Sequence, residues 1–83
     1  MNCWYVYILR CADGSLYTGI ATDVTRRLDE HNTGVRSAAK YTRARRPVTL
    51  VYQEPQDSRS AAARREYQIK QLPRAEKEAL ISV

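Results

Sequence analysis

The sequence predicts an α+β fold in which a small three-stranded antiparallel sheet is flanked by helices, in the order β-β-α-β-α-α. Two strand-like runs come first, and the turn that joins them is too short for a helical crossover, so the strands pair antiparallel. Capping residues and prolines mark three helices, placed without the regular alternation of a parallel sheet. A chain of 83 residues is enough for one domain, and we expect residues 1–83 to form it.

The three predicted strands differ in how much of each can be buried. Trp4–Leu9 is apolar or aromatic at every position, which is typical of a central strand covered on both faces. Leu16–Ile20 is the return strand of the hairpin. Pro47 opens the third strand, Val48–Tyr52, and we expect the chain to turn at Pro55–Asp57.

The loop between the first two strands decides which side chains share a face. A two-residue loop would place Tyr17 opposite Arg10 and would send Tyr7 to the other face of the sheet. A three-residue loop over Ala12–Gly14 instead places Tyr17 opposite Leu9. Tyr7 then lies diagonally beside Tyr17 on the same face. Because this loop is a type I turn that ends in a left-handed residue, and a glycine stands there, we predict the three-residue loop.

The three helices are predicted from their capping residues and stops. The first begins at Thr22 or Asp23 and runs to about Asn32, with Gly34 just beyond its end. The second begins at Ser58 or Ser60 and runs to about Gln71, and the third covers Arg74–Leu80 after Pro73.

The charge of the chain is moderately basic and unevenly distributed. Lysines and arginines number 14 against 9 acidic residues, for a net charge of +5 and a pI near 9.6. No acidic residue occurs from His31 to Gln53, a stretch in which we expect a short helical turn and a loop over 34–46. Such a patch is either a phosphate-binding surface or a solvated basic face. Its basic residues are Arg36, Lys40, Arg43, Arg45 and Arg46.

The two cysteines indicate a reducing compartment. Cys3 and Cys11 flank a single predicted strand, and an extended run of that length holds them about 26 Å apart, too far for a disulfide. Neither is spaced as a metal ligand. Together with the lack of a signal peptide or a long apolar run, this favours a cytoplasmic protein with no membrane contact.

Four side chains that suit phosphate chemistry recur at regular spacing. Tyr7, Tyr17 and Arg27 are ten residues apart, and His31 follows one helical turn later. Each has an ordinary structural role available: core packing for the tyrosines, an ion pair with Asp23 for the arginine, and a favourable helix C-terminus for the histidine. None of these roles explains why the four fall together. Phenols, a guanidinium and an imidazole in one small area can bind and cleave a phosphodiester.

Glu66 is a fifth candidate, on the second predicted helix. It lies beside Ala62 and Ile69 on the side expected to face the sheet. Two interpretations remain open. It is either a surface glutamate paired with Lys70 one turn later, or a ligand for Mg²⁺, which keeps several waters and needs few protein ligands.

These residues resemble the motifs of the GIY-YIG nuclease domains over nearly the whole chain. Tyr5-Val6-Tyr7 corresponds to the first motif, with Tyr5 in place of its leading glycine, and Tyr17-Thr18-Gly19 corresponds to the second. Arg27, His31 and Glu66 match the family's arginine, the position one turn later and the metal-binding glutamate. The likeness is to small stand-alone bacterial members and to the nuclease domain of Slx-type structure-specific endonucleases. A downstream asparagine that many members carry is missing after residue 32.

The resemblance implies a DNA endonuclease of the repair or recombination type, directed by the shape of branched, flapped or single-stranded DNA. Glu66 would hold a single Mg²⁺ or Mn²⁺ ion, and Arg27 would contact the scissile phosphate. We favour Tyr17 as the general base, with Tyr7 positioning water or phosphate and His31 relaying the proton. The backbone of DNA would be contacted by Arg26, Lys40, Arg43, Arg45 and Arg46. The alternatives are a non-catalytic nucleic-acid-binding module and a domain that depends on a targeting protein; the oligomeric state stays open.

Overall fold

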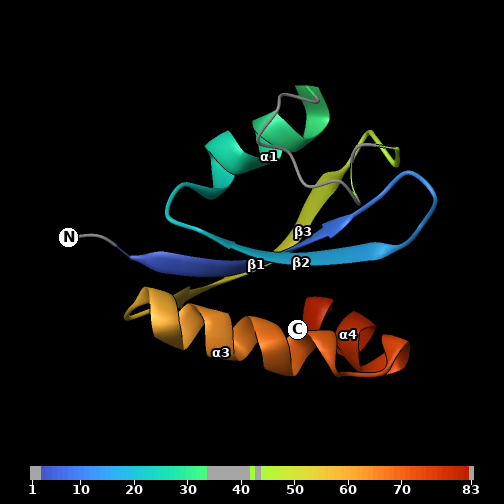
Figure 1. Cartoon of the computed structure of the whole chain (residues 1–83). Helices are drawn as coiled ribbons and strands as arrows, with labels where there is room; N and C mark the ends of the chain where they lie inside the picture. Colours follow the sequence, from blue (N-terminus) through green and yellow to red (C-terminus); the bar gives the residue numbers. More distant parts are fainter. Residues whose placement is uncertain (1–2, 34–41, 43, 83) are drawn as a thin grey trace.

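A computed structural model describes residues 3–33, 42 and 44–82, and it has the predicted element order. The sheet forms a middle layer, with one helix on one face and two helices on the other (Figure 1). The strands are β1 (Trp4–Arg10), β2 (Leu16–Ala21) and β3 (Thr49–Gln56). The helices are α1 (Val24–Thr33), α3 (Arg59–Lys70) and α4 (Arg74–Ile81). No helix among these described residues is long and apolar enough to cross a membrane.

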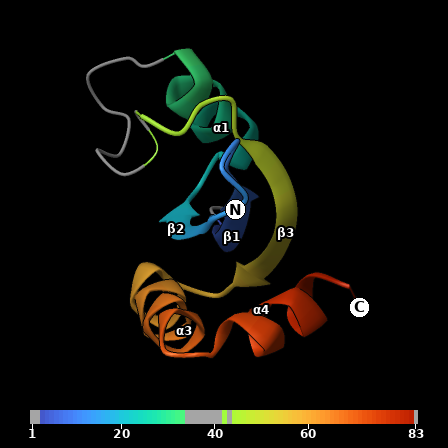
Figure 2. The same cartoon turned by 90° about the vertical axis from the view of Figure 1, so that its right-hand side faces the viewer.

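The sheet has the strand order β2-β1-β3, so β1 is central and antiparallel to both neighbours. This confirms the prediction from its continuous apolar sequence. Val6 and Ile8 point toward α3 and α4, whereas Tyr7 and Leu9 point toward α1, and all four are buried. The protein therefore has two thin cores, one on each side of β1. Figure 2 shows α1 on one side of the sheet and α3 and α4 on the other.

The hairpin between β1 and β2 has the predicted three-residue loop. The N–H of Cys11 donates to the carbonyl of Ser15 at 2.8 Å, and the N–H of Gly14 donates back to the carbonyl of Cys11 at 2.9 Å. Gly14 has a φ of 85°, the left-handed conformation that glycine adopts without a steric cost. Leu9 consequently lies opposite Tyr17, and the two catalytic-candidate tyrosines share the face that α1 covers.

The third strand is longer than predicted. We expected a turn at Pro55–Asp57, but Pro55 and Gln56 continue β3, opposite Tyr5 and Trp4. Proline is tolerated because β3 is an edge strand, where one side of the backbone needs no partner. A register shift between Ile8 and Leu9 also bends this strand and leaves one extra residue on it.

The helix starts follow the predicted caps. Asp23 accepts a hydrogen bond from the N–H of Arg26 at 3.0 Å, and Ser58 accepts one from the N–H of Ala61 at 3.1 Å. These side chains satisfy backbone donors that have no partner within the helix. Gly34, the predicted stop of the first helix, lies outside the described residues.

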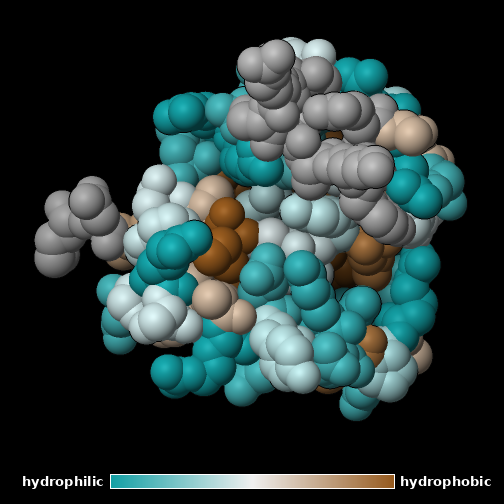
Figure 3. All heavy atoms as spheres, viewed as in Figure 1, coloured by the Kyte–Doolittle hydropathy of each residue, from teal (hydrophilic) through white to brown (hydrophobic). Residues whose placement is uncertain are grey.

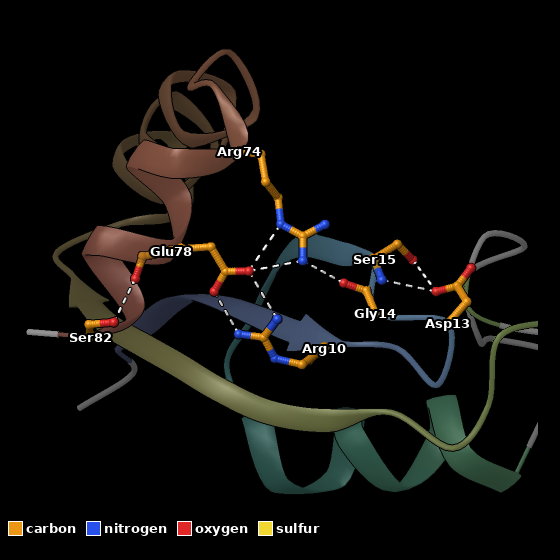
Figure 4. Close-up of polar contacts among 7 residues, drawn as sticks. All are labelled: Arg10, Asp13, Gly14, Ser15, Arg74, Glu78 and Ser82. Carbon is orange, nitrogen blue, oxygen red and sulfur yellow. Dashed lines mark hydrogen bonds and ion pairs between the residues drawn. The ribbon is translucent and has the colours of Figure 1, made fainter.

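Helix α4 is tied to the hairpin end of the sheet by a cluster of charges (Figure 4). Arg10 on β1 donates to both carboxylate oxygens of Glu78, at 3.0 and 2.7 Å. Arg74 also donates to Glu78, at 3.0 Å, and to the carbonyl of Gly14 at 2.7 Å. The two guanidinium groups lower the pKa of Glu78 to about 2, mainly through these hydrogen bonds.

Candidate active site

The sheet and α1 bring the rings of Tyr7, Tyr17 and His31 together. β1 supplies Tyr7, β2 supplies Tyr17 and α1 supplies His31, from the face of the sheet that α1 covers. The ring centroids of Tyr17 and His31 are 5.4 Å apart, those of Tyr7 and His31 are 6.1 Å apart, and those of the two tyrosines are 6.5 Å apart. The clustering predicted from the ten-residue spacing is therefore present.

His31 is enclosed completely and has a partner on each ring nitrogen. Nε2 lies 3.1 Å from the hydroxyl oxygen of Tyr7, and Nδ1 lies 2.7 Å from Oγ1 of Thr42. Burial, with a smaller contribution from the nearby charge of Arg27, lowers the pKa of His31 to about 4. The imidazole is therefore neutral at neutral pH.

Thr42 was missed by sequence reasoning. It lies in a basic stretch with little pattern, and nothing in its neighbours along the chain indicates a buried position. It is nevertheless fully buried and contacts the ring of His31. The only available signal was chemical, because a buried histidine needs a polar partner for its second nitrogen.

Arg27 lies at the edge of this cluster and pairs with Glu30. Its Nη1 donates to the carboxylate of Glu30 at 2.9 Å, and its guanidinium opposes the rise in the pKa of the Tyr7 phenol. The sequence had suggested an ion pair with Asp23 instead. Glu30 is the partner because it lies three residues further on, on the same side of α1, whereas the carboxylate of Asp23 turns back to cap the helix.

The two phenols differ in exposure and in acidity. Tyr7 is 1% exposed, and burial, followed by the neighbouring phenol of Tyr17, raises its pKa to about 12. Tyr17 is only partly buried, and burial also raises its pKa. The positive charge of Arg27 acts in the opposite direction on both phenols.

Glu66 lies on α3, which packs under β1 and β2 on the other side of the sheet. Its negative charge contributes, after larger causes, to the raised pKa of both Tyr7 and Tyr17. It also pairs with Lys70 at 3.6 Å, as one interpretation of the sequence suggested. Within residues 3–33, 42 and 44–82, no three His, Cys, Asp or Glu side chains are grouped to hold a metal. A lone carboxylate fits Mg²⁺, which takes its other ligands from water and phosphate.

A cleft of about 240 Å³ opens beside Arg27 at the β2 edge of the sheet. Figure 3 shows hydrophobic side chains exposed between mainly hydrophilic surfaces on this view of the molecule. The cleft is lined by Trp4, Ile20, Ala21, Thr22, Asp23, Arg26, Arg27 and Glu30.

Three of the basic residues predicted to contact DNA lie within the described part of the chain, and each has an acidic or carbonyl partner. Arg26 is in the first turn of α1, with its side chain 76% exposed, and it pairs with Glu30. Arg46 lies beside the other end of α1, where it donates to the carbonyl of Asn32 at 3.5 Å. Arg45 pairs with Asp13 of the hairpin loop at 3.1 Å. Lys40 and Arg43 lie outside the described residues.

Comparison with known proteins places this arrangement in a family. The family model of the GIY-YIG catalytic domain matches residues 3–79. The UPF0213 protein of Halobacterium salinarum is 60% identical over 76 residues, which cover 92% of this chain and 96% of that protein.

Two solution NMR structures also match. The UPF0213 protein BH0048 from Bacillus halodurans has 50% identity and a TM-score of 0.60, over 96% of this chain and 83% of that one. The protein EF2693 from E. faecalis has 40% identity and a TM-score of 0.64, over 99% and 85%. GIY-YIG domains are nuclease-type hydrolases and generally use divalent metal ions. The chain therefore belongs to the GIY-YIG catalytic domain family, among the UPF0213 proteins.

Proposed function

We propose that the protein is a metal-dependent endonuclease that hydrolyses phosphodiester bonds in DNA. The observation that carries this proposal is the gathering of two phenols, an imidazole and a guanidinium on one sheet face, with the carboxylate of Glu66 acting on both phenols. Phosphodiester hydrolysis needs an activated water, compensation of negative charge on phosphorus oxygens and help for the leaving oxygen. The cluster holds a candidate group for each of the first two needs.

Arg27 is the proposed phosphate-binding residue. It lines the cleft, and the carboxylate of Glu30 lies 2.9 Å from its Nη1. A guanidinium stays charged at any working pH and presents several donors in one plane, which suits the charge that develops on phosphate oxygens. Because the ion pair already restricts the Arg27 side chain, binding of substrate costs it little conformational entropy.

Glu66 is the proposed ligand of one divalent ion, Mg²⁺ or Mn²⁺. When bound, the ion would polarise the phosphate and offset the negative charge of Glu66 near the phenols. Lys70 is no obstacle to this, because its side chain is 50% exposed and a surface ion pair of this kind is weak.

Tyr17 is the proposed general base. It is more exposed than Tyr7, and the positive charge of Arg27 favours its phenolate. Tyr7 is buried beside it, and its hydroxyl lies 3.1 Å from Nε2 of His31. His31 is neutral and can accept a proton that the phenols take up.

The substrate we propose is branched, flapped or single-stranded DNA, as in repair or recombination. Arg26 at one end of α1 and Arg45 and Arg46 at the other can contact the backbone on both sides of the cluster. Contacts to phosphates position DNA but carry no sequence information, so shape would decide where it is cut. The exposed free thiol of Cys3 agrees with a cytoplasmic protein.

The experiment is cleavage of labelled flap, branched and single-stranded DNA with Mg²⁺, Mn²⁺ or a chelator. We expect metal-dependent cleavage that Tyr17→Phe and Glu66→Gln abolish. Tyr67→Phe and Glu76→Gln are matched controls, because both side chains are exposed, and they should retain wild-type rates. Cleavage undiminished by the first pair of variants would refute the proposal.

Two other outcomes correspond to the alternatives. Binding that weakens with salt, with no metal-dependent cleavage, would indicate a nucleic-acid-binding module, which the missing downstream asparagine favours. Cleavage that begins only after adding a cell extract would indicate dependence on a targeting protein.

A further inference from the structure

Trp4 lines the cleft that contains Arg27, and the proposed cleavage chemistry gives it no role. β2 ends at Ala21, which pairs with Tyr5, so Trp4 extends one residue beyond that strand and reaches the cleft at the end of the sheet. Its side chain also packs against one of the two cores. The buried members of that core are Val6, Ile8, Ala62 and Ile69.

The indole ring of Trp4 is anchored from the α3 side as well. Arg59, the first residue of α3, places its guanidinium carbon over the ring, 5.7 Å from the centroid. A cation at this distance is attracted by the electrons of the ring. Trp4 is half-buried, whereas Arg59 is exposed. The ring is therefore a rigid aromatic surface beside an open cleft, and such a surface loses little entropy when a flat partner binds to it.

The cleft combines an apolar wall with a cationic wall. Trp4, Ile20 and Ala21 form the apolar wall, and Arg26 and Arg27 contribute to the cationic wall. A nucleotide has the same two parts, because its base is flat with an apolar face and its phosphate is negatively charged.

The two carboxylates that line the cleft already have partners. Asp23 accepts from the N–H of Arg26 at 3.0 Å. Glu30 accepts from Nε of Arg26 at 3.1 Å and from Nη1 of Arg27 at 2.9 Å. A phosphate in the cleft therefore meets acidic groups whose charge is compensated, and the side chain of Arg26 is 76% exposed to solvent.

The size of the cleft favours one base over a duplex. Its volume of about 240 Å³ is below the range of about 300–1,000 Å³ for sites that enclose drug-sized molecules. Within a duplex, the faces of a base are covered by its neighbours in the stack. Only a base that has left the stack presents a face to an aromatic side chain.

We propose that Trp4 stacks on an unpaired nucleobase next to the phosphate that Arg27 binds. This inference rests on the proposed nuclease function and makes its substrate more specific: DNA with an unpaired nucleotide beside the cleaved bond. Trp4 is then a specificity-determining residue that selects flaps, branch points and single strands. It does so without reading sequence, because every base has a face that can stack on an indole ring.

Trp4 reports on its own stacking, because it is the only tryptophan in the chain. The probe is a duplex with a short single-stranded flap, and a fully paired duplex of equal length is the control DNA. A chelator prevents cleavage, and the anisotropy of a dye on the DNA measures binding. We expect the flap DNA to quench Trp4 fluorescence and the paired duplex to quench it much less. Replacing flap nucleotides one at a time by an abasic sugar should identify one position at the junction where quenching is lost.

Trp4→Leu keeps an apolar side chain against the core and removes the ring. We expect it to weaken binding of the flap DNA about 5- to 150-fold, the range for loss of one base–aromatic stack, with little effect on the paired duplex. The abasic replacement that weakens binding to the wild type should have no further effect in this variant. Tyr52→Leu is the matched control, because Tyr52 is a half-buried aromatic residue on the same core but lies outside the residues that line the cleft. It should bind both DNAs as the wild type does.

Two results with the wild type alone would overturn the proposal, whether or not Trp4→Leu folds. One is flap DNA that binds without quenching Trp4, and the other is quenching that no single abasic replacement removes. A folded Trp4→Leu protein with wild-type affinity for flap DNA would also overturn it.

The same assays separate this proposal from the proposed function. Position-specific quenching without metal-dependent cleavage would refute the nuclease function and leave the base-binding site. Metal-dependent cleavage of flap DNA without quenching would refute the base-binding site alone. A protein that binds neither DNA would refute both.

Discussion

Gly19 lies directly opposite Tyr7 across the hairpin, and a methyl group at Gly19 would be 2.6 Å from the hydroxyl of Tyr7. The same methyl would be 3.2 Å from the ring of Tyr17. The glycine of the second motif is thus required for space, because its backbone lies against the phenol that contacts His31. Its role in the cluster is to let the two tyrosines share one face at close range.

Gly19→Ala should therefore lower both stability and cleavage. Tyr7 is buried and bonded to His31, so it cannot move away cheaply, and overpacking of this kind costs about 1–3 kcal/mol. Urea denaturation measures the first effect and flap cleavage the second. Gly14→Ala is the matched control: its positive φ costs about 1–3 kcal/mol for alanine, but there is open space around it, so cleavage by the folded fraction should be retained. Equal cleavage by both variants would contradict this account of Gly19.

Arg27→Lys should show whether the shape of the guanidinium matters. A lysine keeps the charge but lacks the planar fork of donors that can contact Glu30 and a phosphate at the same time. We expect kcat to fall about 100- to 1,000-fold, the range for loss of one transition-state donor. Arg26→Lys, one position earlier and largely exposed, should change cleavage by a few-fold at most. Single-turnover kinetics with saturating protein separates this effect from weaker binding.

The pKa of His31 should be measurable directly and should be low. Burial lowers the pKa from 6.5 to about 4, so the unfolded chain binds a proton in a pH range where the folded protein does not. The free energy of unfolding is therefore highest above about pH 6.5, and it falls as the pH drops toward about 4. NMR titration of the single histidine gives the pKa, and His31→Phe should remove the corresponding part of the pH dependence of unfolding. A titration midpoint near 6.5 in the folded protein would contradict the buried, neutral ring.

The cluster of Arg10, Arg74 and Glu78 predicts a second effect at lower pH. The pKa of Glu78 is depressed from 4.5 to about 2, so its contribution to stability is present above about pH 4.5 and is lost as pH falls toward 2. The difference in free energy of unfolding between the wild type and Glu78→Gln should shrink over that interval. Glu76→Gln, exposed on the same helix, serves as the control, since its difference from the wild type should depend much less on pH. Parallel curves for wild type and Glu78→Gln would argue against the cluster.

Much of the fold could be predicted because it depends on neighbours in the chain. The apolar run of β1, the turn that ends in Gly14 and the caps at Asp23 and Ser58 all act over a few residues. These patterns were sufficient for the element order and for the hairpin register. Even the shared face of Tyr7 and Tyr17 follows from a local choice of loop length.

The turn predicted at Pro55–Asp57 was wrong, because the position of a strand in the sheet overrode a local sequence preference. Pro55 usually marks a turn, but on an edge strand it costs no hydrogen bond, and β3 continues through it. Whether a strand lies at an edge depends on the order of the whole sheet, which no short window of sequence contains.

In the candidate site, too, some positions follow from local sequence and others depend on tertiary packing. The spacing of Tyr7, Tyr17, Arg27 and His31 follows from one hairpin and one helix, whose periods are regular and local. The contact between His31 and Thr42, and the approach of Glu66 from the other side of the sheet, join segments separated along the chain. These depend on how the helices pack on the sheet, because a buried polar group takes whichever partner packing brings within reach.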